Sequence, residues 1–246
     1  MSVQPEIRFV LVSSARSGTT VTIDLISQHP DAYVHGEVFC RNDRDKQLRL
    51  REEFVAEIGL ENRLSDTVDF AKKVLGFSPA PKCTFFKMWR GQAPEAFDYL
   101  LRNAGVHKIV HVRENRLAQY SSQLLTKATG VSHLPEAMVR KGAGKHERPK
   151  VEFDKEHFMK FCKRQERKVA EVLKKAEGPV LRTTYADTTS NGPAEIYEFL
   201  GLESFETIFR LQRLNSKSTI DRFREDQHEE ILASLDEVGH PEWVSE

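Results

Sequence analysis

The chain has 246 residues, of which 39% are hydrophobic and 30% are charged, and its 37 basic residues balance 37 acidic residues. This length suits one large α/β domain over residues 1–246, and the zero net charge argues against a general nucleic-acid-binding protein. No apolar run reaches the ~18 residues that a membrane span requires, so we expect a cytoplasmic protein. The three cysteines, Cys40, Cys83 and Cys162, lie far apart and indicate neither a disulfide framework nor a zinc site.

Short apolar runs alternate with helical patterns along the chain. In chain order we predict a strand at 7–12, a helix at 20–28, a strand at 83–89, a helix at 94–104, a strand at 108–112, a helix at 115–128, a long helix after Asp154, a strand at 180–184 and a helix at 193–200. This alternation implies right-handed crossovers. The predicted fold is α/β, with a P-loop-like central parallel sheet of four or five strands, helices on both faces and a mostly helical C-terminal part.

In parallel sheets, ligands bind beyond the carboxyl ends of the strands. That rule places four parts of the chain around one crevice: 13–20, 87–90, Arg113 and Tyr185. The long helix is expected to contribute packing rather than chemistry, through a buried stripe of Phe158, Phe161, Cys162, Val169, Val172 and Leu173.

The turn between the first strand and the first helix, Ser13–Thr20, consists of small residues around one glycine. Its backbone N–H groups and the start of the following helix suit a phosphate or a sulfate. Compared with the Walker pattern G-x-x-x-x-G-K-[ST], Gly18 and Thr20 match, whereas a serine replaces the first glycine and Thr19 replaces the lysine. Arg16 supplies a different cation. No predicted strand runs into an aspartate that would hold magnesium, so an ordinary ATPase or GTPase is disfavoured.

A second anion-binding pattern begins where the predicted strand 108–112 ends. Arg113 follows this strand, and Ser121 lies eight residues later, about two turns into the next helix. A guanidinium and a hydroxyl that meet at one point form a clamp for a phosphate.

Together these two segments resemble the sulfotransferases that use 3′-phosphoadenosine 5′-phosphosulfate (PAPS), most closely the bacterial carbohydrate type that includes the nodulation-factor and trehalose sulfotransferases. The resemblance also takes in 35–39, 86–89, 181–187 and 198–202. It departs from the family after Tyr185, where Ala186 intervenes before the acidic Asp187.

The resemblance implies roles for individual residues. The donor's 5′-phosphosulfate would be bound by Arg16, Ser17, Gly18, Thr19 and Thr20. Arg113 and Ser121 would bind its 3′-phosphate, Glu37 would be the catalytic base, and Arg16 would also stabilise the leaving phosphate. Sulfuryl transfer is an in-line displacement of a group with less charge than a phosphoryl group, so it can proceed on protein cations without a metal. The expected acceptor is the hydroxyl of a small molecule or glycan, such as a carbohydrate or glycolipid.

Several residues near these segments have alternative interpretations. Glu37 is either the base or a solvated loop carboxylate, and His35 competes with it as base or is a packing residue. Lys87 either reaches the sulfuryl group or pairs with a nearby carboxylate.

The family's basic C-terminal segment near the 3′-phosphate would correspond to Arg213 or Lys217. His107 and His111 have the spacing of helical zinc ligands, but the intervening residues favour a strand, in which they would lie ~13 Å apart.

The sequence is also compatible with two other functions. A small-molecule kinase with a P-loop would require magnesium, and a non-catalytic sensor would bind phosphoadenosine nucleotides without turnover. Residues 140–175 include 13 basic and 6 acidic residues, whereas 221–246 include 2 basic and 9 acidic residues. These segments either form complementary solvated faces or, in the case of the basic segment and its loop at 140–149, a rim over an anionic ligand.

Overall fold

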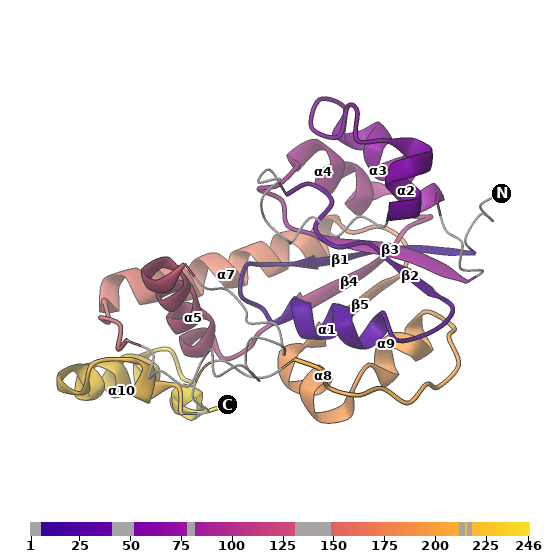
Figure 1. The fold of residues 1–246 in the computed structure, drawn as a ribbon. Coiled ribbons are helices and arrows are strands. Elements are labelled where there is room, and N and C mark those ends of the chain that lie inside the picture. The colour runs from indigo at the N-terminus through magenta and orange to yellow at the C-terminus, as the bar shows by residue number, and fades with distance from the viewer. Residues whose placement is uncertain (1–5, 41–51, 78–81, 131–148, 212–214, 216–217) are drawn as a thin grey trace. The chain divides into compact units, whose positions relative to one another are not determined.

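The computed structural model describes residues 6–40, 52–77, 82–130, 149–211, 215 and 218–246 (Figure 1). Within these residues the strands are β1 (Ile7–Ser13), β2 (Ala32–Val34), β3 (Cys83–Met88), β4 (His107–Val112) and β5 (Val180–Thr184). The helices are α1 (Thr19–Ile26), α2 (Glu52–Ile58), α3 (Thr67–Gly76), α4 (Pro94–Arg102), α5 (Arg116–Thr129), α7 (Lys155–Lys175), α8 (Tyr185–Asn191), α9 (Ala194–Phe199) and α10 (His228–Glu237), with short 3-10 helices at Ile220–Arg222, Glu225–Gln227 and Pro241–Val244.

The strands form one parallel sheet in the order β2-β3-β1-β4-β5. The chain starts at the central strand and adds strands on both sides of it, which is the doubly wound arrangement of α/β proteins. The predicted central parallel sheet and the mostly helical C-terminal part are therefore confirmed in the described residues.

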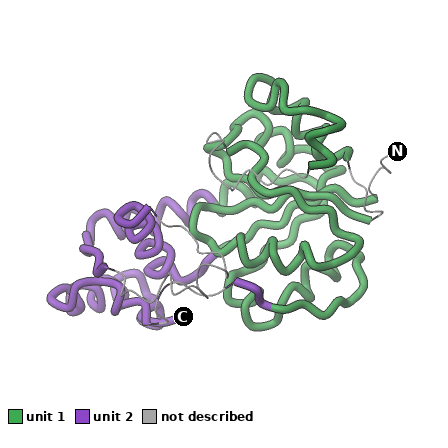
Figure 2. The backbone as a smooth tube through the Cα atoms, in the orientation of Figure 1, with its two compact units in different colours: residues 1–112, 169–208 green, residues 113–168, 209–246 purple. Residues whose placement is uncertain are grey.

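The chain forms two compact units, which Figure 2 shows in two colours. The first comprises 1–112 and 169–208 and contains the whole sheet. The second comprises 113–168 and 209–246 and is helical in its described part. The assignment of residues 1–246 to a single domain stays a prediction.

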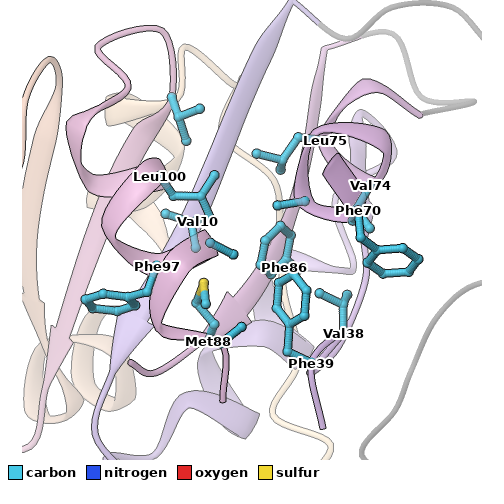
Figure 3. Packing of buried hydrophobic residues seen from close by; sticks show 14 of the residues in the cluster. Val10, Val38, Phe39, Phe70, Val74, Leu75, Phe86, Met88, Phe97 and Leu100 are labelled. Carbon is cyan, nitrogen blue, oxygen red and sulfur yellow. The ribbon is translucent and has the colours of Figure 1, made fainter. Parts of the chain in front are cut away.

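Helices cover both faces of the sheet in the first unit, as predicted. Successive residues of a strand point to opposite faces, so Val10 and Val12 pack with α3, α4 and residues 172 and 176 on one side. Figure 3 shows part of this cluster, in which the rings of Phe39 and Phe86 are neighbours with centroids 5.8 Å apart. On the other face, Phe9 and Leu11 pack with α1 and α9. Burial on both faces explains why the apolar residues 9–12 of β1 and 85–86 of β3 are consecutive rather than alternating.

The second unit has its own core, made by α5, α10, the first half of α7 and the segments between them. Its largest buried side chains are Tyr120, Phe153, Phe158, Phe161, Phe223 and Trp243. Asp154 accepts a hydrogen bond from the backbone N–H of His157 at 2.8 Å and so caps α7 as predicted. Lys155 pairs with Glu237 at 2.9 Å, which is one contact of the expected kind between the basic and acidic segments.

The predicted buried stripe of α7 is correct only for its first half. Phe158, Phe161 and Cys162 are buried, but Val172 is only partly buried and Leu173 is 38% exposed. The prediction for Leu173 is wrong because Val172 and residue 176 pack on the first core, and Leu173, the residue after Val172, points about 100° away from it around the helix.

Candidate active site

The turn after β1 has the backbone conformation of an anion-binding loop. Arg16 has φ 64° and Gly18 has φ 87°, both in the left-handed region. Gly18 is the N-cap of α1 and has no side chain to cap its first amides, and the first turn of α1 holds no acidic residue. The Ser17 hydroxyl donates to the Ser14 carbonyl at 2.7 Å, which holds the turn closed. Backbone N–H groups at such a turn and helix start attract phosphate or sulfate.

Gly18 is required by a close neighbour as well as by its conformation. A Cβ atom at this position would lie 2.1 Å from Cδ2 of Tyr185, the first residue of α8. The ring of Tyr185 therefore lies directly against the loop. Tyr185 is fixed by the start of α8, where the Thr184 hydroxyl accepts from the Asp187 N–H at 3.0 Å and donates to its carboxylate at 2.6 Å. This reciprocal cap accounts for Asp187, the acidic residue that is displaced from the family position.

The predicted base, Glu37, is buried and held at both carboxylate oxygens. Lys87 Nζ lies 2.8 Å from Oε1, and the two side chains are 10% and 4% exposed. Gln92 Nε2 donates to Oε2 at 3.0 Å. The solvated-loop interpretation of Glu37 is therefore wrong, and the expectation that Lys87 pairs with a carboxylate is confirmed. A carboxylate has about four lone-pair positions, so these two contacts leave it able to accept a further proton donor.

The backbone around Glu37 is positioned by β3. The His35 N–H donates to the Phe85 carbonyl at 2.9 Å and the Lys87 N–H donates to the Gly36 carbonyl at 3.2 Å, so backbone bonds to β3 continue as far as Gly36, the residue before Glu37. Buried Arg63 then donates to the carbonyls of Val38 at 3.1 Å and Cys40 at 2.5 Å. Neighbouring Val38 and Phe39 are buried in the core. The carboxylate thus sits on rigid structure, although it follows a strand of only three residues.

The loop and the Glu37–Lys87 pair lie at the same end of neighbouring strands. In the register of the sheet, Leu11 of β1 is opposite Lys87 of β3, two residues before β1 ends at Ser13. His111 of β4 is opposite Ser13 on the other side. The first unit therefore brings together the predicted loop, base and lysine at the carboxyl ends of three adjacent strands, where ligands of such sheets bind.

His111 packs under the loop as a neutral ring. Its Nε2 lies 3.3 Å from the Thr22 hydroxyl of α1. Burial lowers the pKa of His111 to about 4, against smaller opposing effects of the Ser17 backbone and the Asp187 charge. His107 and His111 belong to β4, which confirms the strand and rules out their helical spacing as zinc ligands. The ring of His107 contacts Phe199 instead.

The competing base, His35, is a packing residue. Its ring is fully buried and makes edge contacts with the rings of Tyr33 and Phe54, whose centroids lie 5.0 and 5.2 Å from its own. A ring enclosed on both sides by aromatic neighbours is not placed to meet a substrate.

In the second unit, Arg113 and Ser121 belong to one buried polar cluster. Arg113 Nε donates to Glu246 Oε1 at 2.7 Å and Nη2 donates to Oε2 at 2.5 Å, a bidentate pair. Arg222 Nη2 donates to Glu246 Oε2 at 3.1 Å, and its Nη1 donates to the Ser121 hydroxyl at 3.2 Å. Arg113 and Ser121 are thus linked through Glu246 and Arg222, and their use as one phosphate clamp stays a prediction.

The helix that carries this cluster has a defined start. The Asn115 side chain accepts from the Ala118 N–H at 2.8 Å and caps α5. Its amide donates to the carbonyls of Trp243 at 3.0 Å and Ser245 at 2.8 Å, which brings 243–246 to the start of α5. Burial tends to raise the pKa of the Glu246 carboxyl, but the Arg113 and Arg222 guanidiniums outweigh it and lower that pKa below its usual value.

Three residues of these sites were missed by sequence reasoning: Gln92, Arg222 and Glu246. Arg213 and Lys217, the residues considered for the basic C-terminal segment, lie outside the described residues, as does the loop at 140–148. In the described part of the chain, no group of three or more histidine, cysteine, aspartate or glutamate side chains is placed to hold a metal ion. No helix there is long and apolar enough to cross a membrane.

Comparison with known proteins gives a likeness of fold. No protein-family model matches the chain, and no curated protein sequence matches it. Sixteen chains of known structure do match, among them the crystal structure of a sulfotransferase from Alicyclobacillus acidocaldarius. That structure is 15% identical in sequence, with a TM-score of 0.51 over 98% of this chain and 95% of the other. The chain therefore has an α/β fold similar to that of a bacterial sulfotransferase along its whole length.

Proposed function

We propose that the protein is a sulfotransferase that moves a sulfuryl group from PAPS to an acceptor hydroxyl. The observation that supports this most strongly is the buried Glu37 carboxylate, held by Lys87 and Gln92 at the same sheet end as the loop 13–20. A loop of this kind binds an anion, and a fixed carboxylate beside it is suited to accept a proton. The fold likeness agrees with this reaction.

The loop has the chemistry to hold the sulfate end of the donor. In this proposal, the amides at Ser17–Thr20 and the side chain of Arg16 bind the 5′-phosphosulfate, and Arg16 stabilises the negative charge that develops on the leaving phosphate. Lys87, 2.8 Å from Oε1, offsets the charge of the carboxylate toward the anionic donor. Gln92 fixes the orientation of the carboxylate by its bond to Oε2.

Glu37 acts as the general base. It takes the proton of the acceptor hydroxyl while the oxygen attacks sulfur, and the bond from sulfur to the 5′-phosphate oxygen breaks to release 3′-phosphoadenosine 5′-phosphate (PAP). The transfer changes no oxidation state, so it needs no oxidant or reductant. In this proposal the loop amides and Arg16 supply the positive charge that a metal would otherwise supply. We assign Arg113 and Ser121 to the donor's 3′-phosphate, and a carbohydrate or glycolipid to the acceptor.

The test is donor recognition followed by transfer. Calorimetric titration of the full chain with PAP and with adenosine 5′-monophosphate (AMP) should show tighter binding of PAP, by about 10- to 100-fold, which corresponds to one charge-assisted hydrogen bond. Radiolabelled PAPS should then label a sugar or glycolipid acceptor in the presence of the enzyme. Equal binding of PAP and AMP would contradict the assignment of the donor. PAP-selective binding without transfer to any acceptor would favour a nucleotide sensor, and phosphoryl transfer from ATP with magnesium would favour a kinase.

A further inference from the structure

The Glu246 carboxylate is bound in the second unit in the way that a protein binds a ligand anion. Both of its oxygens accept from Arg113 in a two-bond fork, and Arg222 donates to one of them as well. The side chains of Arg113, Arg222 and Glu246 are 10%, 2% and 7% exposed. Glu246 itself lies outside any helix or strand.

The surrounding groups are donors suited to an anion with more oxygens than a carboxylate. Beyond the two guanidiniums, the Ser121 hydroxyl lies 3.2 Å from Arg222 Nη1 and is fully buried. The Ser121 hydroxyl donates to the Ala118 carbonyl at 3.1 Å. Rotation of the hydroxyl would let it donate to a ligand instead. Guanidinium groups together with a hydroxyl on a helix are well suited to bind a phosphate.

We propose that Glu246 is an internal competitor, whose carboxylate occupies an anion subsite formed by Arg113, Arg222 and Ser121 and leaves when a phosphate monoester binds there. The identity of that phosphate as the 3′-phosphate of the donor rests on the proposed function; the competition itself does not.

The charges favour this exchange. A carboxylate carries one negative charge and two acceptor oxygens, whereas a phosphate monoester near neutral pH carries a charge of about −1.5 to −2 and three acceptor oxygens. The ester therefore gains more from the same two guanidiniums. Departure of Glu246 requires rotation of its own side chain and no unwinding of α5, because the bonds from Asn115 end at the carbonyls of Trp243 and Ser245. The carboxylate keeps the buried arginines neutralised until the ligand arrives, at a cost in apparent affinity.

Substitution of Glu246 by glutamine tests the competition. Glu246→Gln keeps the shape of the side chain and removes its charge, so PAP should bind about 10- to 100-fold more tightly than to the parent protein, the factor expected for one charge-assisted hydrogen bond. Inorganic phosphate should also raise the melting temperature of Glu246→Gln more than that of the parent protein. If the subsite takes the 3′-phosphate, as the proposed function has it, AMP, which lacks that group, should bind both proteins equally. Glu242→Gln is the matched control, because Glu242 is exposed, lies four residues away and pairs only with His240 among the contacts described.

Unchanged or weaker PAP binding by a folded Glu246→Gln protein would overturn the proposed competition and make Glu246 a structural ion pair. If the variant is unstable in buffer, recovery of its stability by phosphate would support the competition, and no recovery would overturn it. Glu246→Asp, which keeps the charge but shortens the reach, should give an affinity between the two. Tighter PAP binding by Glu246→Gln, with no sulfuryl transfer by the parent protein or the variants, would support the competition and reject the proposed function. Sulfuryl transfer by the parent protein, with PAP binding unchanged in Glu246→Gln, would support the proposed function and reject the competition.

Discussion

Lys87 and Glu37 form an ion pair across neighbouring segments of the sheet, with Nζ 2.8 Å from Oε1 and both side chains almost fully buried. Burial of two charges is costly unless their remaining hydrogen-bonding positions are also satisfied, and Gln92 supplies one of these bonds to the carboxylate. A pair of this kind, placed at the end of the sheet where ligands bind, is better explained by chemistry than by stability alone.

Glu37→Gln should reduce turnover and spare donor binding. The amide keeps the size of the side chain and a contact with Gln92 but cannot take a proton from the acceptor. General-base catalysis contributes about 10²- to 10⁴-fold, so kcat should fall by that factor while the Kd for PAP changes little. The measurement is steady-state transfer from PAPS together with calorimetry for PAP.

The control for this substitution is Glu95→Gln, an exposed position at the start of α4, which should behave like the parent protein. Near-normal turnover of Glu37→Gln would reject Glu37 as the base. Loss of PAP binding would instead make the carboxylate a structural partner of Lys87.

Arg113→Ala should abolish the preference for PAP over AMP. Removal of the guanidinium takes away the bidentate donor that we assign to the 3′-phosphate, and about 10- to 100-fold of affinity for PAP should go with it, while AMP binding stays the same. Arg113→Lys should recover only part of the preference, because a lysine keeps the charge but not the two-bond fork. Arg224→Ala, which removes an exposed arginine of the same unit, is the control. A preference for PAP that survives in Arg113→Ala would place the 3′-phosphate elsewhere.

Most of the sheet could be predicted from the sequence because β1, β3 and β4 contain short apolar runs that are buried on both faces. The positions of these strands and of β5, which is buried only at Thr183 and Thr184, agree with the prediction. β2 could not be predicted in the same way. It has only three residues, Ala32–Val34, which is too short for any periodicity, and it is a strand because of its pairing with β3.

In the candidate sites, too, local patterns could be predicted and contacts between distant parts of the chain could not. The loop 13–20 and the spacing of Arg113 and Ser121 are local patterns, so they are visible in the sequence. Arg222 and Glu246 lie 101 and 133 positions away from the residues they bind, Ser121 and Arg113. Their approach depends on how the C-terminal segment packs on α5, and such packing leaves no mark in local sequence.

Gly18→Ala should destabilise the protein more than the same change at another left-handed glycine. Gly130, the C-cap of α5, has φ 68° and no atom of the described residues within 4 Å of an added Cβ, so Gly130→Ala should cost about 1–2 kcal/mol for the backbone conformation alone. At Gly18 the added methyl would also collide with the Tyr185 ring, 2.1 Å away. Urea denaturation should therefore give a larger loss of stability for Gly18→Ala, with weaker PAP binding. Equal losses for the two variants would mean that Tyr185 moves aside freely.

Sulfuryl transfer should persist when excess EDTA is present. This follows from Thr19 in the position of the Walker lysine and from the charge that Arg16 and the loop amides supply in the proposed mechanism. The measurement is the rate of label transfer from PAPS with and without the chelator, after prolonged dialysis. Activity that disappears with EDTA and returns with magnesium would revive the kinase-like interpretation of the loop.

The last prediction concerns the neutral His111 beneath the loop. Burial lowers its pKa to about 4 in the folded protein, from an ordinary value of 6.5. Between these two pH values, the unfolded chain binds a proton that the folded protein does not bind. The free energy of unfolding should therefore be unaffected by His111 above about pH 6.5 and should fall as the pH drops toward 4, by up to about 1.4 kcal/mol per pH unit.

His111→Gln removes this proton-binding group and keeps a polar atom near Thr22, 3.3 Å from Nε2 in the parent protein. The variant should be less stable than the parent protein at neutral pH, because glutamine does not fill the space of the ring. The difference between them should shrink on acidification, by about 2 kcal/mol from about pH 7 to about pH 5, because only the parent protein loses the contribution of His111. Urea unfolding at both pH values measures it. A difference that is constant with pH would mean that His111 is protonated in the folded protein as readily as in the unfolded chain.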